Sequence, residues 1–271
     1  YVRGQHEDYD RWRQRGNAGW GYEDVLPYFR KAENQQRGPD KYHGADGPLP
    51  VSDWRHHDPL SEAFVVAAAE VGIRTNPDFN GATQEGAGFF QTTTNRGRRA
   101  STAYSYLRPA KTRRNLHIET SALAQRILFE GRRAKAVEYR QEGRVRTARA
   151  RKEILVSSGA YNSPQLLQLS GVGPADLLTQ HGIGIVLDAP GVGNDLQDHM
   201  QVRLVTRCAQ KVTLNDVVNH PIRKMMAGLQ YAAFRKGPLT IAAGTSGAFF
   251  KTSPRLASLD IQIHFLPFST D

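Results

Sequence analysis

The chain contains very little cysteine, the residue that cross-links small proteins through disulfides and binds metal ions through sulfur. Among its 271 residues, Cys208 is the only cysteine. A single cysteine excludes an internal disulfide and any metal site built from several cysteines. We interpret Cys208 as a small, partly buried apolar residue. The scarcity of cysteine favours a reducing compartment, and we expect a cytoplasmic protein.

Long hydrophobic runs are also missing. No window approaches the roughly 20 consecutive apolar residues that a membrane-spanning helix needs, so we predict no such helix. The first residues, Tyr1 to Gln5, contain neither an initiator methionine nor the apolar stretch of a secretory signal. We therefore expect the sequence to begin inside a longer protein.

Acidic residues are the scarcer charged class. The chain has 26 Asp and Glu against 36 Lys and Arg, a formal net charge of +10. Such an excess can mark a surface for nucleic acid or another polyanion, or it can be a solvated face. No aromatic residues alternate with the scattered arginines, as a stacking platform requires. We predict no nucleic-acid partner, and the alternative to an enzyme is a non-catalytic basic α/β module that binds a polyanion.

What the chain does contain is a pattern for a buried strand, a turn without bulk and a helix, between residues 153 and 173. The apolar run 154–156 predicts the strand. Gly159 and Ala160 form the turn, and their small side chains let a nucleotide approach the backbone closely. We expect this corner to lie in a parallel sheet, free of bulky side chains, and the functional assignment depends on it.

The helix after this turn has its own start and stop signals. Ser163 is suited to the N-cap, Pro164 to the first helical position and Gly171 to the end of the helix. The N–H groups at the start of a helix attract an anion such as a phosphate. The pattern therefore indicates a nucleotide site.

The spacing across this segment is more specific than the pattern itself. It resembles the second signature of the glucose–methanol–choline (GMC) family of FAD-dependent alcohol oxidoreductases, at Gly159, Ala160, Ser163, Pro164, Leu166, Leu167, Ser170, Gly171, Val172 and Gly173. The amino-terminal segment resembles the family phrase that directly follows the loop facing the isoalloxazine ring. It does so in order, at Tyr1, Arg3, Gly4, Asp8, Tyr9, Asp10, Trp12, Gly19, Trp20, Tyr22 and residues 24–29.

The resemblance implies an α/β fold with α+β parts, in which a partial FAD-binding, Rossmann-like domain is interleaved with an antiparallel-sheet substrate domain. It divides the chain into a flavin-proximal loop and helix segment (1–50), a first part of the substrate domain (51–112), a segment of the FAD-binding domain (113–200) and a second part of the substrate domain (201–271).

The residue pattern also predicts individual elements. We expect helices over Glu23–Lys31, from Asp58-Pro59 to Gly72, over Pro174–Gln180, and over Ile222–Phe234, whose methionine and aromatic stripe we place in the core. We expect strands over Ala87–Thr94, in a meander within Asn115–Ala150, and over Ile183–Val186, Val202–Thr206, Ser246–Lys251 and Ile261–Phe265.

The resemblance implies FAD as the cofactor and names candidate site residues. Ser158, Gly159 and Ala160 would lie against the cofactor at the turn. Ala124 occupies the place on a strand whose backbone pairs with the adenine edge, where the family often has valine. Phe265 is a candidate for the wall of the active site, and a core aromatic is an equally good interpretation of it.

Two sequence features of the family are not found in this chain, its dinucleotide-binding fingerprint and its catalytic histidine. The G-x-G motifs that begin at Gly86, Gly171 and Gly191 each lack the third glycine of a dinucleotide-binding fingerprint. None of the nine histidines matches the family's catalytic histidine, so we nominate no catalytic residue and no metal site. We interpret the chain as an internal fragment, and expect it alone neither to hold FAD tightly nor to oxidise alcohols.

The resemblance further implies the reaction, which is oxidation of an alcohol to an aldehyde by hydride transfer to FAD. The enzyme would be a dehydrogenase or oxidase with a small alcohol as substrate, and nothing indicates its electron acceptor. Family members that act on choline tend to carry an acidic residue in the segment equivalent to Gly237–Phe250. That segment has no acid here, so we predict a neutral alcohol as the substrate.

Overall fold

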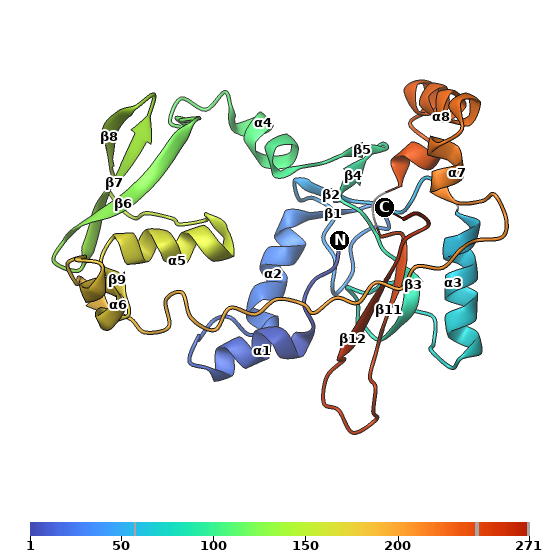
Figure 1. Ribbon diagram of the computed structural model, residues 1–271, viewed down its shortest axis with the longest axis horizontal. Helices are drawn as coiled ribbons and strands as arrows, with labels where there is room; N and C mark the ends of the chain where they lie inside the picture. The colour runs from blue at the N-terminus through green and yellow to red at the C-terminus, as the bar shows by residue number, and fades with distance from the viewer. Residues whose placement is uncertain (57, 242–243, 270–271) are drawn as a thin grey trace. The chain divides into compact units, whose positions relative to one another are not determined.

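The computed structural model describes residues 1–56, 58–241 and 244–269 (Figure 1). It divides into two compact units, one of residues 1–113 and 204–271 and the other of residues 114–203. Both combine helices with antiparallel sheets. Within the described ranges, none of the helices is both long and apolar enough to cross a membrane. The cofactor and substrate roles that we gave to parts of the chain stay predictions.

The first unit holds most of the helices. Its helical elements are α1 (His6–Gln14), α2 (Tyr22–Ala32), α3 (Pro59–Glu70), the π-helical η1 (Ala103–Leu107), α4 (Arg108–Ala110), α7 (Leu214–Val218), α8 (Pro221–Phe234) and the 3-10 helix η2 (Pro238–Thr240). Its strands are β1 (Glu33–Gln35), β2 (Leu49–Val51), β3 (Gly86–Phe89), β4 (Thr94–Asn95), β5 (Arg98–Arg99), β11 (Ser246–Phe250) and β12 (Ile261–Phe265).

A three-stranded antiparallel sheet, in the order β12-β11-β3, organises this unit. Helix α3 packs on one face, where the small side chains of Ala68, Ala87 and Ala248 are buried together (Figure 1). Phe249, the next residue of β11, is buried with Phe79 and Phe90 in a separate aromatic cluster. Successive residues of a strand point to opposite faces, so the sheet contributes to two separate cores.

The helices with strong local signals lie where we predicted them. The Asp58 carboxylate accepts the Ser61 N–H at 2.9 Å and Pro59 occupies the first turn of α3. At the start of α2, Asp24 accepts the Gly21 N–H at 3.0 Å. These are contacts between near neighbours in the chain, which is why the sequence indicates them.

The core position predicted for the stripe of α8 is wrong. Ile222, Met225, Met226 and Leu229 are exposed, and Ala227 is the buried residue of this helix. Their spacing of three and four residues puts them on the side of the helix turned away from Ala227. The segment before α8 also differs from expectation, because Val202–Thr206 forms no strand and Cys208 is exposed.

The second unit is built on the predicted antiparallel meander, β6 (Ala122–Glu130), β7 (Arg133–Gln141) and β8 (Arg144–Arg149). It also contains α5 (Gly159–Leu169), β9 (Val172–Gly173), α6 (Ala175–Gln180) and β10 (Leu187–Asp188), which replaces the strand expected at Ile183–Val186. The Ser170 hydroxyl, just past the end of α5, accepts the Ile127 N–H of β6 at 2.7 Å. This bond ties the helix to the sheet.

The strand expected at residues 154–157 does not form. These residues are not paired with any strand in the described part of the chain, and Leu155 is 81% exposed. A strand needs a neighbour for its N–H and C=O groups, so an apolar run alone does not make one. The expected place of this corner in a parallel sheet is therefore wrong for this structure.

Helix α5 begins earlier than its local signals indicated. Ser158 is its N-cap and Gly159 its first residue, so Pro164 lies inside the helix and not at its start. The Ser163 hydroxyl accepts the Ser158 N–H at 3.0 Å, and Ser163 is not the N-cap of the helix. The end agrees with expectation, because Gly171 follows the helix with φ +88°.

Candidate functional site

The predicted cofactor corner is bare, as its small residues indicate. Ser158, Gly159 and Ala160 are exposed. Gly159 has φ +87°, and apart from its chain neighbours and the backbone of its own helix, no described atom lies within 4 Å of the place where a β-carbon would stand. The Ser158 side chain makes no capping hydrogen bond, so it does not compete for the first N–H groups of α5. These N–H groups therefore suit an anionic ligand.

Ala124 lies on β6, an edge strand of the meander, and is exposed. It pairs with Tyr139 of β7, and a β-bulge interrupts the register between Ala124 and Arg126. An edge strand leaves some of its backbone groups without a ladder partner, and such groups can read a base edge. The unit thus brings together the two elements that carry the predicted cofactor residues, because α5 packs against β6.

Phe265 and its neighbour His264 point to opposite faces of β12. The Phe265 ring stacks on Phe64 of α3, with ring centroids 5.0 Å apart. A cavity of about 320 Å³ contains His264 and Gln262 in its wall, and its lining is completed by Tyr1, Val2, Phe90, Gln91, Thr92 and Gly244. The wall role of Phe265 stays a prediction, and this geometry favours the core interpretation. Strand alternation is the signal that singles out Gln262 and His264.

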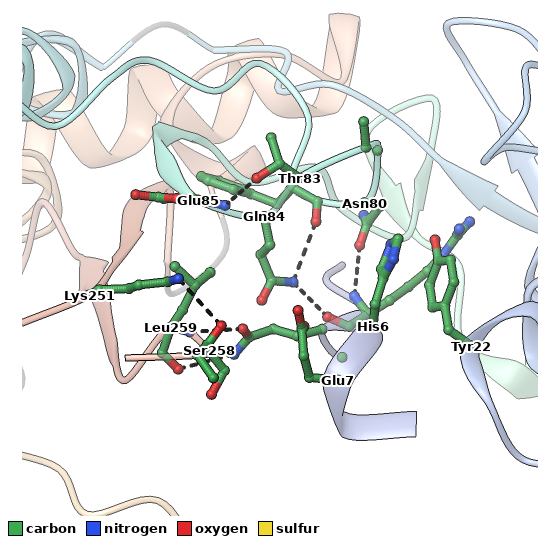
Figure 2. Close-up of a pocket in the computed structure, with 17 residues that line it drawn as sticks. His6, Glu7, Tyr22, Asn80, Thr83, Gln84, Glu85, Lys251, Ser258 and Leu259 are labelled. Atoms are coloured by element: carbon green, nitrogen blue, oxygen red, sulfur yellow. Dashed lines mark hydrogen bonds between the residues drawn. The ribbon is translucent and has the colours of Figure 1, made fainter. Parts of the chain in front are cut away.

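A second, smaller cavity of about 170 Å³ lies where three segments of the first unit meet (Figure 2). The Gln84 amide donates to the Arg3 carbonyl at 2.9 Å, and the Arg3 N–H donates to Asn80 Oδ1 at 2.7 Å. Gln5 exchanges hydrogen bonds with the backbone of Leu259. These contacts join the amino-terminal segment to the turn around Asn80 and to the β11–β12 loop.

A chain of four charged residues, three of them buried and Asp78 partly exposed, lies next to this cavity. The Arg3 guanidinium donates to Glu33 Oε2 at 2.7 Å. The same oxygen lies 3.0 Å from His43 Nδ1, and His43 Nε2 lies 2.9 Å from Asp78 Oδ2. The side chains of Arg3, Glu33 and His43 are almost completely buried. We call these four residues the charge chain.

The two carboxylates control the protonation of His43. Burial acts to lower the pKa of His43, but the hydrogen bonds to Asp78 and Glu33 outweigh it and raise that pKa to about 9. Burial acts to raise the pKa of Asp78, and the hydrogen bond from His43 outweighs it, so that pKa is lowered. His43 is therefore a cation at neutral pH, and the charge chain is electrically balanced.

Comparison with known proteins decides the family. The model of the family described as GMC oxidoreductase matches residues 1–201. The chain belongs to the GMC oxidoreductase family.

Curated relatives of this GMC chain include choline dehydrogenases. The chain is 45% identical over 267 residues to the mitochondrial choline dehydrogenase of Homo sapiens, covering 98% of this chain and 45% of that protein. It is 42% identical to the oxygen-dependent choline dehydrogenase of Brucella anthropi, covering 98% of this chain and 48% of that protein. The chain thus spans about half the length of the curated relatives it matches.

Solved structures show the same fold. An FAD-dependent oxidoreductase from Chaetomium thermophilum matches with a TM-score of 0.82 and 27% identity, over 92% of this chain and 46% of that one. Pyridoxine 4-oxidase from Mesorbium loti matches with a TM-score of 0.65 and 32% identity, over 70% of this chain and 38% of that one. We expected the functional assignment to depend on a parallel sheet at this corner, and the described part of the chain has none there. The family assignment rests on these matches instead.

The charge chain gives this GMC fold a pH-dependent stability. Because the folded state raises the pKa of His43 from 6.5 to about 9, the stabilisation is fully present below pH 6.5 and is lost as the pH rises through about 9. We expect the urea midpoint to fall between about pH 7 and about pH 10, and to fall less in His43→Gln. Equal slopes against pH in the two proteins would contradict this assignment.

Proposed function

We propose that the protein carrying this chain is an FAD-dependent alcohol oxidoreductase. The support is membership of the GMC family together with the bare corner at Gly159, which leaves room for a nucleotide at the start of a helix whose N-cap side chain makes no capping hydrogen bond. Ser158, Gly159 and Ala160 would hold the cofactor's phosphates or ribose, and the β6 backbone at Ala124 would read the adenine edge. Bound FAD would supply the acceptor for the hydride that leaves the alcohol carbon.

The chain's own residues bind and orient the alcohol in this proposal. The wall of the larger cavity offers polar groups, the Gln262 amide, the Thr92 hydroxyl and the His264 ring, beside aromatic side chains. These groups can exchange hydrogen bonds with a hydroxyl and leave an apolar chain against Phe90. A general base must lie within hydrogen-bond reach of that hydroxyl, and we assign this role to no residue of the chain.

We infer that the preferred substrate is a neutral alcohol. No carboxylate is among the described residues that line the larger cavity. The segment 237–250 also contains no Asp or Glu. A quaternary ammonium ion is recognised by a carboxylate or by an aromatic cage, and this wall offers Tyr1 and Phe90 without a carboxylate. The relatives named choline dehydrogenase make choline the natural comparison.

Steady-state kinetics with the full-length gene product test this inference. We expect kcat/KM for a neutral primary alcohol to exceed that for choline by about tenfold or more. The described residues of the cavity wall include no carboxylate, whose attraction for a quaternary ammonium ion at about 4 Å is worth about 4 kcal/mol at an effective dielectric constant of about 20. Gln262→Glu adds a carboxylate to the cavity wall, so it should reduce the difference in kcat/KM between the neutral alcohol and choline. Gln230→Glu, on the exposed surface of α8, should leave that difference unchanged. Choline as the better substrate of the unaltered protein would refute the inference.

A further inference from the structure

The charge chain touches the wall of the larger cavity at two points. On one side, Arg3 Nε donates to the Tyr1 hydroxyl at 3.3 Å. On the other, Gln35 donates to Glu33 Oε1 at 3.4 Å and exchanges amide hydrogen bonds of 2.9 and 3.0 Å with Gln91. Tyr1 and Gln91 both line the cavity. Glu33 is therefore the branch point from which two side-chain paths lead to the same wall.

His43 is the residue on which this arrangement depends. Each of its ring nitrogens faces a carboxylate, Glu33 on one side and Asp78 on the other, and ionised carboxylates only accept hydrogen bonds. Only the imidazolium has an N–H for both. A neutral ring would turn a lone pair toward one of the two carboxylates, which costs free energy in a buried site. The Gln35 amide, 3.3 Å from Nδ1, can donate to a lone pair there, but Glu33 would still lose the N–H that the ring gives it.

The other charged groups around this ring act on its partners. Arg3 pairs with Glu33 from the amino-terminal segment, and Arg37 favours the ionised form of Asp78. Asp40 accepts the backbone N–H of His43 at 2.7 Å and so fixes the loop that carries the ring. The loop, the amino-terminal segment and β1 are therefore held at one point.

We propose that His43 is a positioning residue for the alcohol-binding cavity: as a cation it fixes Glu33, and through Arg3 and Gln35 it holds Tyr1 and Gln91 in the cavity wall. This inference rests on the proposed function. His43 lies behind the wall and is absent from the cavity's lining, so it affects the shape of the binding site and not the reacting atoms.

Steady-state kinetics of the full-length gene product, against a neutral alcohol and as a function of pH, provide the first test. His43→Gln can donate to only one of the two carboxylates, so we expect its KM to rise about tenfold while kcat changes less than about threefold. In the unaltered protein KM should rise toward the variant's value above about pH 9, and the variant should lack this rise. The unaltered protein and His43→Gln should contain equal amounts of FAD. His181→Gln, at an exposed histidine, should behave as the unaltered protein.

Carbon-13 NMR of histidine-labelled protein provides a second test that needs no activity. One histidine signal should titrate at about pH 9 and be missing in His43→Gln. All signals titrating near the ordinary value of 6.5 would overturn the proposal, and so would a variant with unaltered KM and pH profile. A protein that shows the signal but oxidises no alcohol would refute the proposed function and leave the fixed position of His43 standing.

Discussion

Gly159→Val is expected to lower the affinity of the full-length gene product for FAD by about 100-fold or more. Gly159 has φ +87°, a conformation that costs a β-branched residue about 1–3 kcal/mol, so the turn must rearrange. Any conformation that valine adopts there also places methyl groups where we propose that the nucleotide approaches the backbone. Titration of the apoprotein with FAD, followed by flavin fluorescence, measures the effect.

Gly182→Val is the matched control. Gly182 also has a positive φ, +67°, and apart from its chain neighbours, no described atom lies within 4 Å of the place where its β-carbon would stand. It follows α6 and not α5, so valine there adds similar strain outside the cofactor corner. We expect FAD affinity close to that of the unaltered protein. Equal losses in the two variants would mean that strain alone weakens binding, and the corner would lose its proposed role.

Glu33→Leu is expected to destabilise the protein by about 3–5 kcal/mol, because it leaves the cations of Arg3 and His43 buried without their shared partner. Glu33 is completely buried, so solvent does not replace the lost interaction. Urea denaturation at neutral pH measures the change in the free energy of unfolding.

The control for this substitution is Glu130→Leu, which removes an exposed carboxylate paired with Lys135 at 2.9 Å. Solvent and salt screen such surface pairs, so the urea midpoint should hardly move. If Glu33→Leu were as stable as Glu130→Leu, the charge chain would not hold the amino-terminal segment, and the positioning role of His43 would fail with it.

Local signals allowed much of the secondary structure to be predicted. The cap at Asp58 lies three residues from the N–H that it accepts, and the meander shows as alternating residues with Gly131 and Gly143 in its turns. Elements that depend on distant partners could not be predicted in the same way. The apolar residues at 154–156 predict a strand, yet no described strand pairs with this segment.

The charge chain shows the same limit at the level of the site. Arg3 is separated from Glu33 by 30 residues, and His43 from Asp78 by 35. No spacing rule connects such residues, so the sequence does not predict this cluster. Part of the cavity wall could have been predicted from the sequence, because the alternation of side chains along a strand places His264 on the face opposite Phe265. The family resemblance, carried by residue order over long segments, was the sequence signal that the comparisons confirmed.

The most direct test of the proposed function is the FAD content of the purified full-length gene product. The protein is denatured, the released flavin is quantified by absorbance and its identity is established by mass spectrometry. We predict one FAD for each protein chain, together with bleaching of the bound flavin when a neutral primary alcohol is added without oxygen. A protein that carries no flavin, and takes none up from a solution of FAD, would contradict the assignment.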